Sequence, residues 1–259
     1  MELARAWLGD NGGPIVPPEI LALLDGHDLT RGFEPELGIG ELVTELDEFA
    51  GEHRNHDLAV VGSAAGGRTL LAIEGKADEA FGSFTVAGYL KHCERREAKG
   101  LENDRKTNAE VDKRVQVSRR RQRPSNAPKR IGQLCRAIFG QSSDPADVVH
   151  PIANPLRYQL IAALAGLVIE AKARDCEQGV FIVHEFLSIP DPERGLEGTN
   201  PKKVKRNSVA FERFVQSLPG APQTAVTAGN LVGPLEVPGD GRVPGELPLL
   251  VGKVTRRLT

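Results

Sequence analysis

The stretch DLAVVGSAAGGRTLLAIEGK, residues 57–76, contains two short apolar runs separated by a glycine-containing segment. The first run includes the β-branched residues Val60 and Val61. Two such runs, joined by a few residues that include glycine, are typical of a β-hairpin. We therefore predict strands over 57–62 and 68–76, connected by a longer loop.

The second predicted strand ends in charged residues. Because successive side chains of a strand point to opposite faces, Ala72, Glu74 and Lys76 are expected to share one face. Asp57 opens the preceding strand, and hairpin pairing would bring it close to Glu74. Charges beside a sheet core are costly unless something pairs with them. The cluster is therefore either a functional site or an ion-pair network at a sheet edge.

This combination of side chains suits phosphate chemistry. Two carboxylates that converge at a strand end can hold a hard cation such as Mg²⁺, which prefers oxygen ligands. Such a cation orients a water molecule and stabilises the negative charge that develops on a phosphate. A neighbouring lysine can hold the water or neutralise the phosphate. Asp57, Glu74 and Lys76 are thus candidates for metal-assisted phosphodiester hydrolysis.

The rest of the chain predicts alternating helices and strands. Residues 41–52 fit either a helix or a strand, because their apolar positions match both periodicities. Residues 154–175 have the strongest helical pattern, with Asn154 as the expected cap and Pro155 at the first helical position. The remaining expected elements are a helix near 18–25, a buried strand over 179–189, a helix around SVAFERFVQSL and a last strand near ELPLLVGKV.

A basic segment interrupts this alternation. Residues 91–130 contain fourteen Lys and Arg and six Asp and Glu, although the whole chain has a net charge of −2. The acids end at Asp112, so the segment is either a solvated helix face or a surface that contacts phosphates. Few aromatic residues accompany it, which favours contact with a duplex backbone over stacking on single-stranded bases. The candidate phosphate contacts are Arg119, Arg120, Arg121, Arg123, Lys129 and Arg130.

Composition narrows the class of protein. The 259 residues, of which 40% are hydrophobic, can form one large domain or two small ones. No apolar run is long enough for a membrane span, and the first residues do not resemble a signal peptide. The three cysteines are widely spaced, which is typical of reduced thiols in a cytoplasmic protein. We find neither a glycine-rich phosphate loop nor a Gly-x-Ser-x-Gly elbow, so a small-molecule enzyme has little support.

The order Asp57, turn, Glu74-Gly75-Lys76 resembles the signature of the PD-(D/E)XK nuclease superfamily. The segments EGKADEAFG, SNAPKRI, LRYQL and VFIVHEF resemble a bacterial branch of that superfamily. The resemblance implies a single α/β domain with a restriction-endonuclease-like αβββαβ core, in which helices flank a mixed central sheet. It places the core at about 17–76 and 150–190, a basic helical insertion at about 85–135 and a C-terminal extension at about 191–259. It also favours a strand near 42–49.

The resemblance further implies a DNA endonuclease that depends on Mg²⁺, with Mn²⁺ as a substitute. Asp57 and Glu74 would bind the metal, and Lys76 would position water or phosphate. Gln159 is the expected polar contribution of the later helix. Glu45 is either an additional metal ligand or an exposed carboxylate. His56 stands where the superfamily commonly has proline, a frequent departure.

The resemblance leaves the biological setting open. A restriction or defence role is associated with the superfamily, and a homodimer is common where both DNA strands are cut. The alternative is a non-catalytic module that retains a nuclease-like core and binds nucleic acid or a protein, because a fold does not determine its function.

Overall fold

The computed structural model describes residues 2–9, 13–49, 53–107, 125–144, 147, 149–190, 198–224 and 226–258, without the side chains of 99–107. Its centre is a mixed six-stranded sheet with the order β1-β2-β3-β4-β6-β5. β1, β2 and β3 form an antiparallel meander, β3, β4 and β6 are parallel, and β5 is antiparallel to β6. The strands are β1 (Glu34–Thr44), β2 (Arg54–Ala64), β3 (Gly67–Ala77), β4 (Gln178–Ser188), β5 (Leu231–Leu235) and β6 (Leu249–Leu258).

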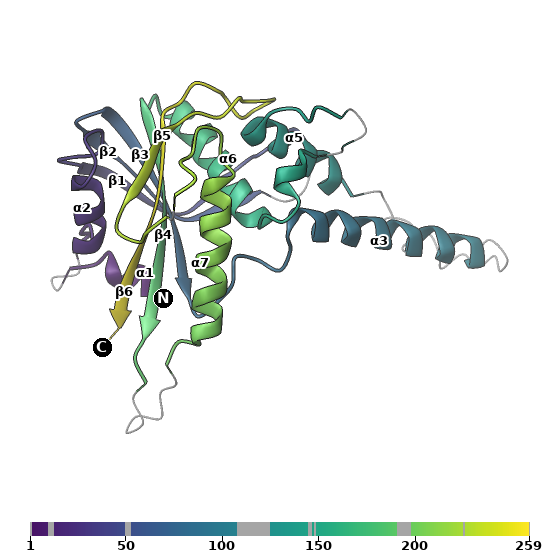
Figure 1. Ribbon diagram of the computed structural model, residues 1–259, viewed down its shortest axis with the longest axis horizontal. Helices are drawn as coiled ribbons and strands as arrows, with labels where there is room; N and C mark the ends of the chain where they lie inside the picture. Colours follow the sequence, from purple (N-terminus) through teal and green to yellow (C-terminus); the bar gives the residue numbers. More distant parts are fainter. Residues whose placement is uncertain are drawn as a thin grey trace.

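Helices cover both faces of this sheet, which confirms the predicted α/β class with a mixed sheet flanked by helices (Figure 1). The short helix α1 (Glu2–Ala6) and α2 (Pro18–Asp25) lie on one face. The other face carries α5 (Ala127–Phe139), α6 (Tyr158–Ala173) and α7 (Pro201–Gln216), with a 3₁₀ turn at Pro151–Ala153. The helix α3 (Val86–Thr107) extends away from the sheet.

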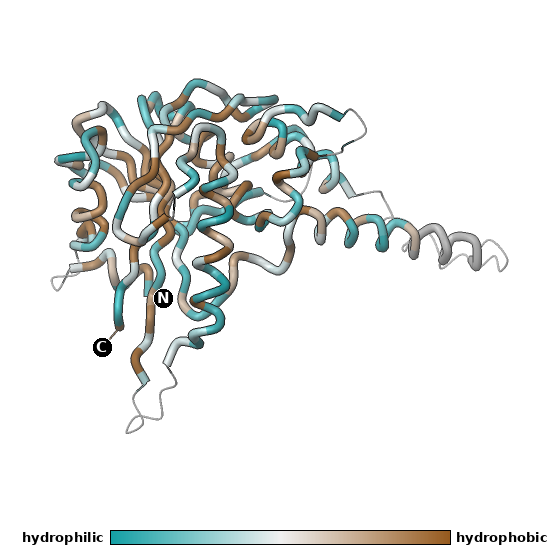
Figure 2. Tube along the Cα trace, in the orientation of Figure 1, coloured by the Kyte–Doolittle hydropathy of each residue, from teal (hydrophilic) through white to brown (hydrophobic). Residues whose placement is uncertain are grey.

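Strand alternation divides the core into two layers. Leu70 and Ala72 of β3 belong to the larger apolar cluster under α5, α6 and α7. Leu71 and Ile73 belong to the smaller cluster under α1 and α2. In Figure 2 the sheet region contains brown, apolar stretches. A strand buried on both faces needs a continuous apolar run.

The predicted hairpin is present, but its connection is tighter than expected. The β2–β3 register runs from Leu58 opposite Ile73 to Ala64 opposite Gly67, which leaves only two residues in the turn. Gly67 has φ +100°, and a Cβ atom there would lie 1.9 Å from an oxygen of Glu177. Glycine is therefore favoured at this position, because other residues are strained at such a φ.

The strand expected near 42–49 lies earlier in the chain. β1 ends at Thr44, and Leu46 and Asp47 turn inward as buried residues outside the strand. β1 is an edge strand that exposes most of its side chains, so it lacks the apolar pattern on which the prediction depended.

The helix expected from Asn154 begins later, at Tyr158. Asn154 instead follows the 3₁₀ turn, so the predicted cap is wrong. The backbone between them pairs with the segment that precedes α3: the Leu156 carbonyl accepts from Val86, and the Tyr158 N–H donates to Phe84. After the turn at Asn154, Arg157 is extended and forms a bridge with Thr85, so the helix begins only at Tyr158.

Among the described residues, no helix combines the length and apolarity needed to cross a bilayer.

Candidate functional site

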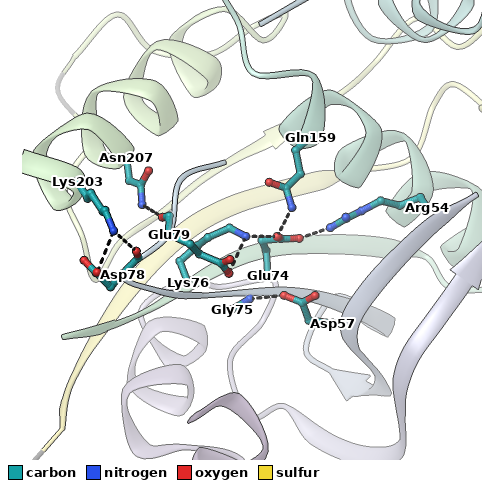
Figure 3. Close-up of polar contacts among 10 residues, drawn as sticks. All are labelled: Arg54, Asp57, Glu74, Gly75, Lys76, Asp78, Glu79, Gln159, Lys203 and Asn207. Carbon is teal, nitrogen blue, oxygen red and sulfur yellow. Dashed lines mark hydrogen bonds and ion pairs between the residues drawn. The ribbon is translucent and has the colours of Figure 1, made fainter. Parts of the chain in front are cut away.

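Glu74 is the centre of a buried charged network on the α6 side of the sheet (Figure 3). Its side chain is only 1% exposed. Lys76 Nζ lies 2.7 Å from Oε1, and Gln159 Nε2 donates to the same oxygen at 2.6 Å. The Arg54 guanidinium donates to Oε2. Two cations and one amide thus compensate for the burial of this carboxylate, as a buried charge requires.

Lys76 shares the face of Glu74, as strand alternation predicts. Its side chain is 5% exposed, and Nζ also lies 3.4 Å from Oε1 of the more exposed Glu79. The ammonium group is 5.7 Å from the centre of the Phe81 ring, within the range of a cation–π contact. The lysine is therefore held between two carboxylates and an aromatic ring.

Asp57 reaches β3 from the other side of the strand. Its Oδ2 accepts a hydrogen bond of 2.8 Å from the Gly75 N–H. A Cβ atom on Gly75, which would point away from Glu74, would lie 3.6 Å from that oxygen. Figure 3 shows Asp57 and Glu74 on opposite sides of the β3 ribbon. The two carboxylates therefore flank the backbone at Gly75 and do not share one face.

The surroundings of the Asp57 carboxyl group change its pKa. Burial, and then the negative charge of Glu74, raise its pKa above the usual value, although the Gly75 hydrogen bond acts in the opposite direction. Asp57 also lines a cavity of about 730 Å³ with Leu3 and Trp7. A positive charge near this carboxyl group would stabilise its ionised form.

Gln159, in the first turn of α6, is where the sequence predicted a polar contribution. Its amide nitrogen binds Glu74. Its Oε1 is buried, and the described part of the chain offers it no hydrogen-bond partner. Buried polar atoms are normally paired, so this oxygen is an acceptor available to a ligand.

The sequence interpretation missed three charged members of this region. One is Arg54, and the others are Glu185 and Lys253. Glu185 of β4 lies opposite Lys76 in the parallel register, and its Oε2 is 2.8 Å from Lys253 Nζ of β6. The carboxyl ends of parallel strands form the crevice where open α/β sheets bind ligands. Arg54 is a charged residue at the start of the first hairpin strand, so the sequence could have indicated it. The pair of Glu185 and Lys253 becomes evident only from the order of the strands.

Helix α7 holds the loop that follows β3. Lys203 Nζ contacts the carbonyl and the carboxylate of Asp78, each at 2.9 Å. Asn207 Nδ2 donates to the Glu79 carbonyl at 2.6 Å. The N-terminal half of α7 therefore borders the same site, a position that no local sequence pattern indicates.

Glu45, one of the predicted metal ligands, is not brought into the Glu74 network. Its exposed carboxylate lies 2.7 Å from Arg242. This is the exposed-carboxylate alternative considered for that residue.

The predicted phosphate contacts are only partly described. Arg119, Arg120, Arg121 and Arg123 lie outside the described residues. Lys129 is exposed and lies 5.9 Å from the centre of the Phe49 ring. Arg130 is buried and forms an ion pair with the buried Asp47. The structure therefore places Arg130 inside the protein, because its charge balances an internal carboxylate.

His56, beside Asp57, makes stability depend on pH. Burial, followed by the charges of Arg54 and Arg174, lowers its pKa from 6.5 to about 3. Between these two pKa values, His56 is protonated in the unfolded chain and neutral in the folded chain. The free energy of unfolding therefore falls as the pH drops below the pKa of the unfolded chain, by up to about 1.4 kcal/mol per pH unit. Between about pH 7 and pH 5, urea unfolding should show wild type losing about 2 kcal/mol more than His56→Gln. An equal loss in both proteins would contradict this assignment.

Within the described ranges, no three His, Cys, Asp or Glu side chains gather where they could hold an ion.

Comparison with known proteins gives a family but no activity. A family model described as "Domain of unknown function (DUF6946)" matches residues 1–258, so the chain belongs to that family. No curated protein and no solved structure matches the chain significantly.

Proposed function

We propose that this member of the DUF6946 family is a metal-dependent phosphodiesterase of the PD-(D/E)XK type that cuts DNA. One observation carries the proposal: the Glu74 carboxylate is held rigidly among Lys76, Gln159 and Arg54 at the carboxyl end of β3, with Asp57 on the adjacent strand. These are the side chains that phosphodiester hydrolysis needs, namely carboxylates for a cation and cations for a phosphate.

The order of the elements supports the same proposal. Helix α2 is followed by the β1-β2-β3 meander, then by α6 and by β4, which is parallel to β3. This is the αβββαβ order that the resemblance implies, and it gives Glu74 and Lys76 the expected place on the third strand.

The donor chemistry fits a hard cation. On the face of Glu74, its carboxylate and the Oε1 of Gln159, which has no partner among the described residues, are oxygen donors, whereas Asp57 lies on the opposite side of β3. A cation there would take over the charge that Arg54 now provides at Glu74. When bound, it would supply positive charge to polarise a water molecule and the phosphate. Mg²⁺ suits such a site because it is commonly bound through one or two carboxylates and retains several waters, and Mn²⁺ would substitute for it.

The chain's own groups would then act on the phosphate. Lys76 is near enough to Glu74 to orient a water molecule beside it or to donate to a phosphate oxygen. Arg54, once released from Glu74, presents the planar set of donors that suits phosphate oxygens. Gln159 would keep Glu74 in place through its amide N–H.

A second candidate is a non-catalytic module. It is favoured by the fact that both Glu74 oxygens already have partners, so Arg54, Glu74 and Lys76, with Glu79 beside Lys76, form an ion-pair cluster without net charge. In that case the cluster stabilises the sheet, and binding of nucleic acid would not lead to cleavage.

Plasmid nicking distinguishes the two candidates. Wild type should convert supercoiled DNA in Mg²⁺ and not in EDTA. Lys76→Met should lower the rate at least about 100-fold, the usual loss when one electrostatic contact to the reacting group is removed. Lys172→Met, at the exposed far end of α6, is the matched control and should cleave like wild type. Cleavage that persists in EDTA or in Lys76→Met would contradict the proposal.

A further inference from the structure

Helix α7 has a strongly basic exposed face. Its sequence PKKVKRNSVAFERFVQ contains five Lys and Arg and a single acid. Lys202, Lys205 and Arg206 are exposed. They stand at i, i+3 and i+4, so they are neighbours on one face of the helix. Three cations are therefore concentrated within about one helical turn.

The opposite face of α7 is buried, so the basic face is turned toward solvent. Asn207, Phe211, Phe214 and Val215 are buried against the sheet, and hydrophilic and apolar segments alternate along the helix in Figure 2. Lys202, Lys205 and Arg206 have no ion-pair partner among the residues that the structure describes, whereas Lys203 is paired with Asp78. Their charge is thus directed to solvent, and no described acidic side chain neutralises it.

The helix that carries this basic face contacts the Glu74 site through its other side. Lys203 and Asn207 hold the Asp78–Glu79 loop, and Glu79 in turn contacts Lys76 (Figure 3). Ser208 Oγ accepts from Lys253 Nζ at 2.9 Å. The positive end of the helix dipole lies in the same half of α7 and adds to the potential. A polyanion that reaches Lys76 would therefore pass close to α7.

We propose that Lys202, Lys205 and Arg206 bind the phosphate backbone of the nucleic acid that is cut at the Glu74 site. This inference rests on the proposed function. Lysine and arginine that neutralise phosphates release counterions, so such binding is independent of sequence and weakens as salt rises. The exposed face supplies positive charge in a chain whose net charge is −2.

Salt-dependent DNA binding tests the surface without any cleavage. The probe is a short fluorescein-labelled DNA duplex, titrated in EDTA and followed by anisotropy at several salt concentrations. In Lys205→Gln/Arg206→Gln, the slope of log Kd against log salt should fall in magnitude by about 2, since each lost phosphate contact removes about 0.9. The affinity in low salt should drop at least about tenfold. Lys172→Gln should match wild type, and thermal melts should show that all variants are folded.

The outcomes separate this inference from the proposed function. If wild type and Lys205→Gln/Arg206→Gln bind with the same slope, the inference is overturned and the nicking result still stands. If binding depends on α7 but plasmid is not nicked, the surface is supported and the proposed function fails. If wild type does not bind the duplex at any salt concentration, the inference is overturned.

Discussion

Replacing Glu74 with glutamine is expected to reduce plasmid nicking at least about 100-fold and to destabilise the fold. The substitution removes the carboxylate proposed to hold the cation. It also leaves Arg54 without its carboxylate partner and Lys76 with only the more exposed Glu79, around a side chain that is only 1% exposed. Breaking a buried ion pair by removing one partner costs about 3–5 kcal/mol. Nicking rates and urea unfolding at neutral pH measure the two effects.

A double variant separates activity from stability. Arg54→Met/Glu74→Gln also removes Arg54, one of the two cations that contact Glu74 in wild type. The double variant should therefore recover part of the free energy of unfolding that Glu74→Gln loses. It should remain unable to cut DNA. Normal cleavage by either variant would contradict the role given to Glu74. A Glu74→Gln protein as stable as wild type would contradict the account of the buried network.

Arg130→Met is expected to destabilise the protein by about 3–5 kcal/mol, because Asp47 would remain buried without its partner. Urea unfolding measures the loss. The neighbouring Lys129→Met is the matched control, since Lys129 is exposed, and it should change stability by no more than about 0.5 kcal/mol.

DNA binding gives the Arg130 prediction a second readout. If Arg130 is internal, folded Arg130→Met should bind duplex DNA with the wild-type salt slope. A variant as stable as Lys129→Met, with a slope reduced by about 1, would show that Arg130 contacts phosphate.

Local patterns in the sequence were sufficient for the hairpin and for the pairing of Glu74 with Lys76. Alternation along a strand is a property of the backbone, so it places Glu74 and Lys76 on one face whatever surrounds them. The burial of Leu70 to Ile73 follows from the same pattern. Gln159 was also located correctly beside Glu74, although the helix that carries it starts later than predicted.

Other parts of the site depend on tertiary structure. Simple hairpin pairing predicted Asp57 next to Glu74, but the regular register ends at Leu58, and Asp57 binds the Gly75 backbone instead. Glu185 and Lys253 meet only because β4 lies beside β6. A local pattern contains no information about that neighbour.

Charge counting in the basic segment could not separate surface from interior. Lys129 and Arg130 are adjacent in the sequence, yet one is exposed and the other balances a buried carboxylate. The helix around SVAFERFVQSL is predicted, but its place at the site is not, for a related reason: its basic residues are fewer, and only the fold brings α7 to the end of β3.

The most direct test of the central claim is an anomalous difference map from a crystal soaked in Mn²⁺. The account predicts a peak within coordination distance of the Glu74 carboxylate, accompanied by movement of Arg54 away from it and by a contribution from Oε1 of Gln159. A map with no peak at Glu74, in which Arg54 still donates to its carboxylate, would contradict a metal-dependent site.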